Sequence, residues 1–275
     1  MREEPRIIYS LDAFPVSNNR WNQGNKFKET IYSTALSILY SHLWYQDIEL
    51  YADDTAYKFL YMLPIRVTEI SSNKDTVIWM KSKIDVIKKQ TKPFVHLDND
   101  VFIKKKIFFD FEKVIVEQND YELYGMYQYR LDFFNQYTQN LDYWKPDLGY
   151  AYNCGVLGFR DFQLRNQFLK AFYDLEEIFI KNHNPKIAKV EPCIVLEQYN
   201  LAALLHHHNI KPTLLLWKKN LFENFQLADK IGYSHIVGQK KYRIDIVEEI
   251  ENRLSKLFPY WYKEVKNALE KEGIA

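Results

Sequence analysis

Two carboxylates two residues apart are the strongest candidates for chemistry in this chain. The apolar residues 93–97 predict a buried strand, and Asp98-Asn99-Asp100 follows it directly. Side chains at i and i+2 of an extended chain point to the same side, so Asp98 and Asp100 can aim at one point. Carboxylate oxygens bind Mg²⁺ and Mn²⁺, which often complete their shell with substrate phosphates. The triplet alone also fits a polar turn, because Asp and Asn favour turns.

A second motif combines an amide with glycine in a segment that reads as a strand. Residues 151–159 are mostly apolar and contain Asn153 and Gly155. Glycine weakens a strand and often marks a place where a ligand approaches the backbone closely. Asn153 could present its amide to a hydroxylated ligand. A bulge or a tight turn is the alternative interpretation.

A third motif carries a histidine, a glycine and a lysine at regular spacing. His235 follows a short apolar segment, and Gly238 and Lys241 come three and six residues later. Histidine can supply a metal-binding nitrogen, glycine lets a loop approach a diphosphate, and lysine adds a point charge. Taken alone, Lys240-Lys241 also fits a solvated basic loop.

In this order, the three motifs resemble those of GT-A-fold glycosyltransferases, and most closely the family 8 type of retaining nucleotide-sugar transferases. The resemblance covers residues 6–241. It implies that Asp98, Asp100 and His235 hold Mn²⁺ or Mg²⁺, and that Gly238 and Lys241 meet the diphosphate of the donor.

Weaker matches extend the resemblance to the donor nucleoside and sugar. Ser10 and Asp12, after the first strand, resemble the nucleoside-contacting segment. Lys81 lies 17 residues before Asp98, where the family usually has arginine. Glu197-Gln198 resembles an Asp-Gln pair in that family. The side chains that the resemblance places beside the donor sugar are Lys81, Asn153, Glu197 and Gln198.

The resemblance implies a metal-dependent hexosyltransferase that retains the anomeric configuration. The expected donor is a nucleotide-diphosphate sugar, with UDP as the first choice, and the expected acceptor is a hydroxyl group in glycan or polysaccharide synthesis. Lys81 and Glu197 replace Arg and Asp, which leaves open a catalytically inactive protein that binds a nucleotide or glycan. A nucleotidyltransferase would need a Gly-rich phosphate loop, but Gly24 is the only glycine before Gly125.

Alternating strands and helices must position these residues. Strands are predicted over 6–11, 48–52, 65–70 and 93–97, with helices over 26–43, 55–62 and 77–90. The second half predicts strands over 121–129, 150–159, 213–217 and 233–237, and helices over 164–180, 193–207 and 244–271. This order favours an α/β, GT-A-like, Rossmann-type fold with a mixed, mostly parallel sheet flanked by helices.

The expected organisation is one domain over residues 1–275. Its parts are a nucleotide-binding half (6–120), an acceptor-side half (121–243) and amphipathic C-terminal helices (244–275). Those helices are expected to dock on the body, although their apolar side could also contact a membrane surface. Asp53-Asp54 predicts a polar strand end, and His206-His207-His208 a helix terminus rather than a metal site.

Composition limits the partners. The net charge of the 275 residues is +1, which gives no strong attraction to nucleic acid. Two cysteines suggest free thiols in a reducing compartment. The N-terminus lacks the apolar core of a signal peptide, and no apolar run could span a membrane. The expected location is therefore the cytoplasm.

Overall fold

The structure is a computed structural model that describes residues 3–18, 22, 24–121, 123–184, 190–218 and 220–274. It divides into two compact units, each described by itself. Unit 1 contains Met1–Asp110 and Lys218–Ala275, and unit 2 is Phe111–Trp217. The expectation of a single domain stays a prediction. Part of the loop predicted over 12–25 lies outside the described residues.

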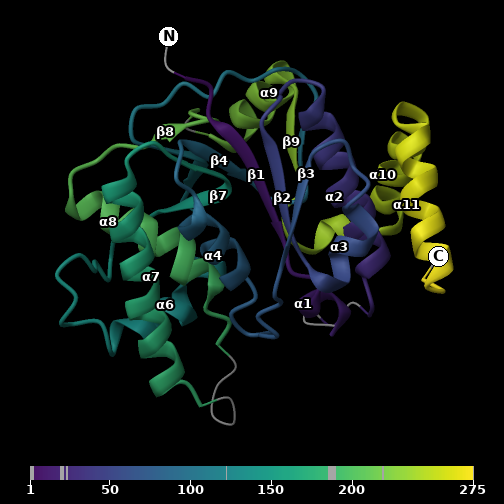
Figure 1. Ribbon diagram of the computed structural model, residues 1–275. Helices are drawn as coiled ribbons and strands as arrows, with labels where there is room; N and C mark the ends of the chain where they lie inside the picture. Colours follow the sequence, from purple (N-terminus) through teal and green to yellow (C-terminus); the bar gives the residue numbers. More distant parts are fainter. Residues whose placement is uncertain are drawn as a thin grey trace. The chain divides into compact units, whose positions relative to one another are not determined.

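The core of unit 1 is a parallel sheet with strand order β3-β2-β1-β4 (Figure 1). β1 and β2 are buried over almost their whole length, as expected of parallel strands rich in Ile, Leu and Tyr. The four predicted strands of the first half are confirmed. They are β1 (Arg6–Leu11), β2 (Ile48–Asp53), β3 (Arg66–Ile70) and β4 (Phe94–Leu97).

Helices of unit 1 connect and cover these strands. α4 starts later than predicted, because the Asp75 carboxylate accepts hydrogen bonds from the amides of Val77 and Ile78 and forms a turn there. The helices are α1 (Phe14–Ser17), α2 (Phe27–His42), α3 (Asp54–Leu60), α4 (Lys81–Lys89), α9 (Leu221–Ile231), a 3₁₀ helix (Gly238–Tyr242), α10 (Ile244–Leu257) and α11 (Pro259–Lys271).

The two C-terminal helices dock on the body of unit 1, as predicted. α10 packs against α2, and α11 packs against α3. Aromatic pairs link the layers, with ring centroids 5.8 Å apart for both Tyr32–Tyr262 and Tyr40–Phe258. Leu254 of α10 and Leu269 of α11 are completely buried. The apolar stripe of this tail therefore belongs largely to the core.

A short antiparallel ribbon joins distant parts of unit 1. β5 (Val101–Ile103) pairs with β9 (Tyr233–His235), and Val101 lies opposite His235. Gly232 leads into β9 with a φ of 72°, and its carbonyl accepts a 2.7 Å hydrogen bond from the amide of Lys104. A Cβ on Gly232 would lie 2.9 Å from the backbone nitrogen of Lys105. Only glycine fits this crossing without strain.

Unit 2 holds a three-stranded mixed sheet. β6 (Val114–Asp120) pairs antiparallel with β7 (Ala151–Phe159) and parallel with β8 (Thr213–Leu214). Its helices are α5 (Leu123–Met126), α6 (Gln128–Asn135), α7 (Phe162–Asn182), a π-helix (Val195–Tyr199) and α8 (Asn200–His207). With the parallel sheet of unit 1, this confirms the predicted mixed, mostly parallel α/β class.

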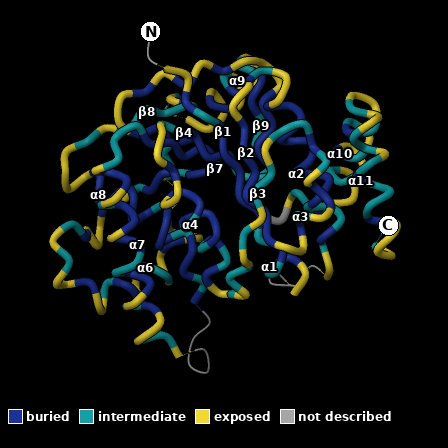
Figure 2. Tube along the Cα trace, viewed as in Figure 1, coloured by how far each residue is buried: buried dark blue, intermediate teal, exposed yellow. Residues whose placement is uncertain are grey.

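The strand predicted over 121–129 is wrong. The strand lies earlier, at Val114–Asp120, where consecutive β-branched residues are buried and pair with β7, while the following residues are helical. Tyrosine favours strands, so Tyr127 contributed to the wrong strand prediction. It is fully buried and its hydroxyl donates to Gln198 Oε1 at 2.5 Å. Figure 2 shows the buried interiors of both units in dark blue.

The end of β2 carries a buried carboxylate with an unusual charge state. Asp53 is 1% exposed. It caps α3, because its carboxylate accepts hydrogen bonds from the amides of Ala56 (2.9 Å) and Ala13 (3.1 Å). Burial, aided by the nearby Asp12 carboxylate, raises the pKa of Asp53 to about 6 despite these hydrogen bonds. The prediction of a polar strand end is confirmed.

Replacing Gly232 by alanine should destabilise unit 1 by more than the cost of a positive φ alone, which is about 1 kcal/mol. The added Cβ must also displace the backbone of Lys105. Urea unfolding measures the loss. The control is Gly273→Ala, since Gly273 has a φ of 70° but open space at its Cβ. Equal losses in the two variants would show that the ribbon crossing tolerates a side chain.

Asp53 should make the free energy of unfolding depend on pH in an unusual direction. The folded protein holds a proton on Asp53 more tightly than the unfolded chain, because its pKa rises from 3.8 to about 6. Its contribution to stability should therefore increase as pH falls from about 6 to about 4, and be smallest above pH 6. The difference in unfolding free energy between wild type and Asp53→Asn, measured across this window, reports the effect. A difference that stays constant between pH 6 and pH 4 would contradict this role of Asp53.

Candidate metal centre and donor site

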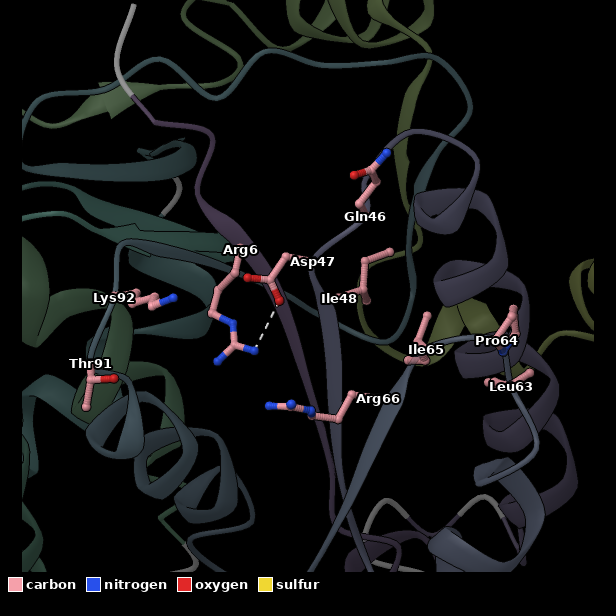
Figure 3. A pocket seen from close by; sticks show the side chains of 10 residues that line it. All are labelled: Arg6, Gln46, Asp47, Ile48, Leu63, Pro64, Ile65, Arg66, Thr91 and Lys92. Atoms are coloured by element: carbon pink, nitrogen blue, oxygen red, sulfur yellow. Dashed lines mark hydrogen bonds and ion pairs between the residues drawn. The ribbon is translucent and has the colours of Figure 1, made fainter.

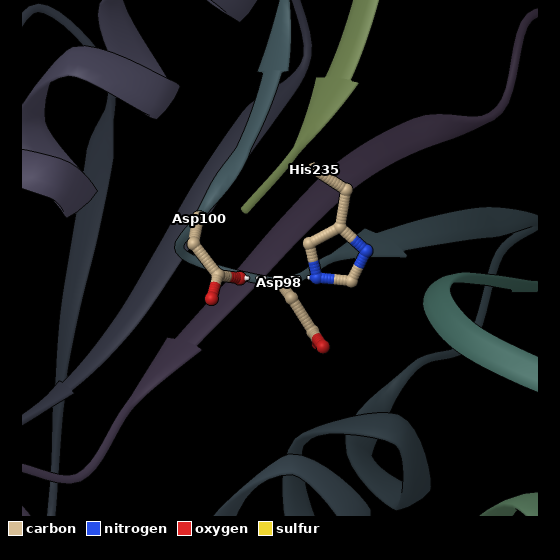
Figure 4. Close-up of side chains that lie close together, drawn as sticks. All are labelled: Asp98, Asp100 and His235. Carbon is tan, nitrogen blue, oxygen red and sulfur yellow. Dashed lines mark ion pairs between the residues drawn. The ribbon is translucent and has the colours of Figure 1, made fainter. Parts of the chain in front are cut away.

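Two separate parts of unit 1 bring together three side chains that could hold a metal ion. Asp98 and Asp100 lie in the turn between β4 and β5, and the ribbon places His235 beside that turn. The amide of Ile236 donates to the carbonyl of Asp100 at 3.1 Å, which fixes the register. One potential ligand atom from each of Asp98, Asp100 and His235 lies within 4.8 Å of the other two (Figure 4).

Two lysines neutralise the carboxylates of this cluster. Lys83 Nζ lies 2.7 Å from Asp98 Oδ1, and Lys241 Nζ lies 2.9 Å from Asp100 Oδ2. His235 Nε2 is 3.4 Å from Asp100 Oδ1. Burial alone would raise the pKa of Asp100, but Lys241 and His235 outweigh it and hold the pKa well below its usual range. Asp100 raises the pKa of Lys241 in turn, against the effect of burial. Asp100 and Lys241 are therefore both charged at neutral pH.

The donor set fits a divalent cation. Two carboxylates and one imidazole offer oxygen and nitrogen ligands, a combination that suits Mn²⁺ and is compatible with Mg²⁺. Asp100 is 5% exposed and stays ionised, so a ligand charge is preformed. The Asp98 side chain is 35% exposed, which leaves the cluster open to solvent on that side. Among the described residues, Asp98, Asp100 and His235 are the group with this metal-binding geometry.

Two serines of α2 hold the acidic turn, residues 98–101, in place by hydrogen bonds. Ser33 Oγ donates to the carbonyl of Asn99 at 3.0 Å, and Ser37 Oγ donates to the carbonyl of Val101. The Asn99 side chain donates to the carbonyl of Ser10 at 2.8 Å. These bonds tie the turn to both α2 and β1, so the direction of its two carboxylates does not depend on the turn sequence alone.

A neutral histidine lies beneath the turn. His96 is 1% exposed, and burial together with the charge of Lys83 lowers its pKa well below the ordinary value. Its Nε2 lies 2.8 Å from Ser10 Oγ. The hydroxyl of Ser10, predicted to contact the nucleoside, therefore bonds to the interior of the protein.

Asp12, the other predicted nucleoside contact, has an extensive set of internal partners. Its two oxygens accept four hydrogen bonds, from the amides of Phe14 and Asn73 (both 3.1 Å) and the hydroxyls of Ser72 (2.9 Å) and Ser82 (2.7 Å). Ser82 lies in the first turn of α4, so Asp12 fastens that helix to the end of β1.

Sequence analysis missed the lysine that contacts Asp98, and the role of Lys81 beside the donor sugar stays a prediction. Lys81 is the first residue of α4, but the residue that reaches Asp98 is Lys83, whose side chain is only 8% exposed. A signal for it exists. Lys83 shares a helix face with Val86 and Ile87, both buried, so this lysine is directed inward.

Three of the residues predicted to lie beside the donor sugar belong to unit 2. Asn153 Oδ1 accepts a 2.9 Å hydrogen bond from the amide of Gly155, which closes a local turn on β7. Glu197 is 6% exposed, and both Glu197 and Gln198 belong to the π-helix. π-Helical turns are rare and are frequently found at functional sites. The roles of these three side chains stay predictions.

The side chains that sequence reasoning set aside behave as expected. Residues 206–208 are exposed histidines at the end of α8. Cys154 and Cys193 are free, buried thiols. Within the described residues, no helix is long and apolar enough to cross a membrane.

Comparison with known proteins gives a family and a fold. A profile for a family of unknown function (DUF6734) matches residues 11–268, almost the whole chain. A search of curated proteins finds no match.

Solved structures similar to this chain are glycosyltransferases. The bifunctional glycosyltransferase WbbM superposes with a TM-score of 0.52 at 9% identity, over 98% of this chain and 52% of that one. GlyE of Streptococcus pneumoniae TIGR4 gives a TM-score of 0.47 at 8% identity, over 98% and 64% of the two chains. LgtC, in complex with donor and acceptor sugar analogs, gives 0.45 at 9% identity, over 94% and 99%.

The chain therefore spans about half of WbbM and 64% of GlyE. At these identities the likeness concerns the fold, and it confirms the predicted GT-A type. This protein belongs to the family of unknown function DUF6734 and has the fold of a GT-A glycosyltransferase.

Proposed function

We propose that this protein transfers a sugar from a nucleotide-diphosphate donor to a hydroxyl acceptor. The observation that carries the proposal is the convergence of Asp98, Asp100 and His235, whose ligand atoms lie within 4.8 Å of one another. The cluster lies beyond the carboxyl ends of parallel strands, where ligands bind in open α/β sheets. The glycosyltransferase fold supports a nucleotide-diphosphate sugar as the substrate of this site.

The three side chains would hold Mn²⁺ or Mg²⁺. When bound, the ion supplies Lewis-acid stabilisation of the negative charge on the leaving diphosphate. The charged side chains of the site are balanced only when metal and diphosphate are bound together. Two carboxylates are already matched by Lys83 and Lys241. A divalent cation alone would leave excess positive charge, which a diphosphate neutralises. Metal and nucleotide diphosphate should therefore bind as a pair.

The two lysines have different roles. Lys241 projects from the 3₁₀ helix and its side chain is 28% exposed, so it can also reach a phosphate where charge develops during bond cleavage. Lys83 is buried and acts as a positioning residue that orients Asp98. Gly238 has a φ of 68° and nothing within 4 Å of the position of a Cβ, which leaves room for a diphosphate to approach the backbone.

The finer assignments follow from the family 8 resemblance. The donor is a UDP-sugar, the reaction retains the anomeric configuration, and the acceptor hydroxyl belongs to a glycan or polysaccharide under synthesis. Lys81, Asn153, Glu197 and Gln198 line the donor sugar. Ser10 and Asp12 support the nucleoside site through the bonds that hold β1, the 72–73 segment and α4 together.

Removing both acidic ligands should abolish metal-dependent turnover. Asp98→Asn/Asp100→Asn keeps the side-chain size but removes the two ligand charges, so nucleotide release from a sugar donor in Mn²⁺ should fall by at least about 100-fold. A screen of nucleotide sugars read by nucleotide release gives the measurement, with Asp54→Asn as the control. A double variant as active as the wild type would refute the metal assignment. Nucleotide binding by the wild type without release from any donor would favour a binding protein that does not turn over sugar.

Lys83→Met should reduce the extent to which the nucleotide strengthens metal binding. Without its ammonium group, the two carboxylates lose a matching charge, so Mn²⁺ alone should bind more tightly. In the wild type, UDP should tighten Mn²⁺ binding by about tenfold or more, and this enhancement should shrink in the variant. Calorimetric Mn²⁺ titrations with and without UDP measure both effects. Lys89→Met, on the exposed side of α4, is the control. Weaker binding of Mn²⁺ alone in Lys83→Met would contradict the charge argument.

A further inference from the structure

Unit 1 contains a second concave site, at the opposite ends of its strands from Asp98. A cavity of about 700 Å³ opens where β1, β2 and β3 begin, next to the segment that connects α4 to β4. Ligand pockets in proteins typically have volumes of about 300–1,000 Å³. The cavity is shown in Figure 3, and its lining residues are Arg6, Gln46, Asp47, Ile48, Leu63, Pro64, Ile65, Arg66, Thr91 and Lys92.

Three cationic groups enter this cavity from separate segments. Figure 3 shows the guanidinium groups of Arg6 and Arg66 and the ammonium group of Lys92 directed toward one open space, together with the hydroxyl of Thr91. The Arg66 side chain is 70% exposed, and Lys92 is exposed as well. Their charges are therefore accessible to a ligand from solvent.

A buried carboxylate holds Arg6 in place at the edge of the cavity. Glu49 lies on β2, between the strands that begin with Arg6 and Arg66, and its side chain is only 5% exposed. Glu49 Oε2 is 2.8 Å from Arg6 and 4.0 Å from Arg66. Its other oxygen accepts a 2.7 Å hydrogen bond from the hydroxyl of Thr68. Arg6 also contacts Asp47 at 3.2 Å. The cations still outnumber the carboxylates by one.

The exposed lining of the cavity is mostly polar, and Ile48, Pro64 and Ile65 add a smaller apolar part. A ligand that fits this lining and volume has an anionic group on a polar body of roughly the size of a sugar. Arginine forks match carboxylate and phosphate oxygens with paired hydrogen bonds.

We infer that this cavity is a second ligand site, which binds a small molecule carrying a phosphate or carboxylate group on a sugar-sized body. It is separate from the metal centre, because its cations come from the amino ends of the strands and the metal ligands follow their carboxyl ends. The site does not depend on the proposed transfer reaction.

Calorimetry on the intact chain without metal tests the site. The probes are glucose 6-phosphate, glucuronate and inorganic phosphate, with glucose as the neutral control. Glucose 6-phosphate or glucuronate should bind, glucose should not, and Arg66→Gln/Lys92→Gln should weaken binding by about tenfold or more. Lys89→Gln, outside the cavity, should bind as the wild type does. The two sugar probes distinguish a phosphate ligand from a carboxylate ligand.

Two further results separate this site from the metal centre. Binding of the anionic sugar should be unchanged in Asp98→Asn/Asp100→Asn, and binding of UDP with Mn²⁺ should be unchanged in Arg66→Gln/Lys92→Gln. The inference is overturned if neither anionic sugar binds at millimolar concentration. It is also overturned if Lys241→Gln weakens their binding while Arg66→Gln/Lys92→Gln does not, since the anions would then occupy the metal centre.

Discussion

The buried charge of Asp100 is the constraint on which the site depends. An ionised carboxylate removed from water is costly unless cationic groups and hydrogen bonds surround it. Asp100 meets this condition only because Lys241 and His235 arrive from a part of the chain more than 130 residues away. The β5–β9 ribbon delivers both, and Gly232 lets the ribbon form beside the 104–105 backbone. The candidate metal centre is therefore complete only when the C-terminal part packs beside the acidic turn.

Around this centre, polar side chains at the strand ends connect neighbouring elements by hydrogen bonds. Asp12 joins β1 to α4, Asp53 joins β2 to α3, and Asn99 joins the acidic turn to β1. Asp53 and Asp12 accept hydrogen bonds from backbone or hydroxyl donors, and Asn99 donates to a backbone carbonyl, at places where parallel strands leave polar groups unpaired. The same edge of the sheet therefore carries groups that bind substrate in the proposal and groups that hold the substrate-binding loops in position.

Charge is distributed unequally between the two ends of the parallel sheet. At the carboxyl ends, two carboxylates are balanced by two lysines, so the centre is ready for a cation and an anion together. At the amino ends, the three cations Arg6, Arg66 and Lys92 outnumber the carboxylates of Glu49 and Asp47 and leave a positive excess. The first arrangement suits a metal–diphosphate pair, and the second suits an anion alone.

The sequence by itself determined the α/β class, most strand positions and the identity of the three metal-binding candidates. Hydrophobic periodicity and motif spacing are local properties, so they can be read without a structure. Only the tertiary structure showed that Lys83 contacts Asp98, since the direction of this side chain depends on how α4 packs against β1. It also showed helices where a strand was expected over 121–129, because β7 pairs with the earlier residues Val114–Asp120. The cationic cavity had no sequence signal, because Arg6, Arg66 and Lys92 become neighbours only when parallel strands align their first residues.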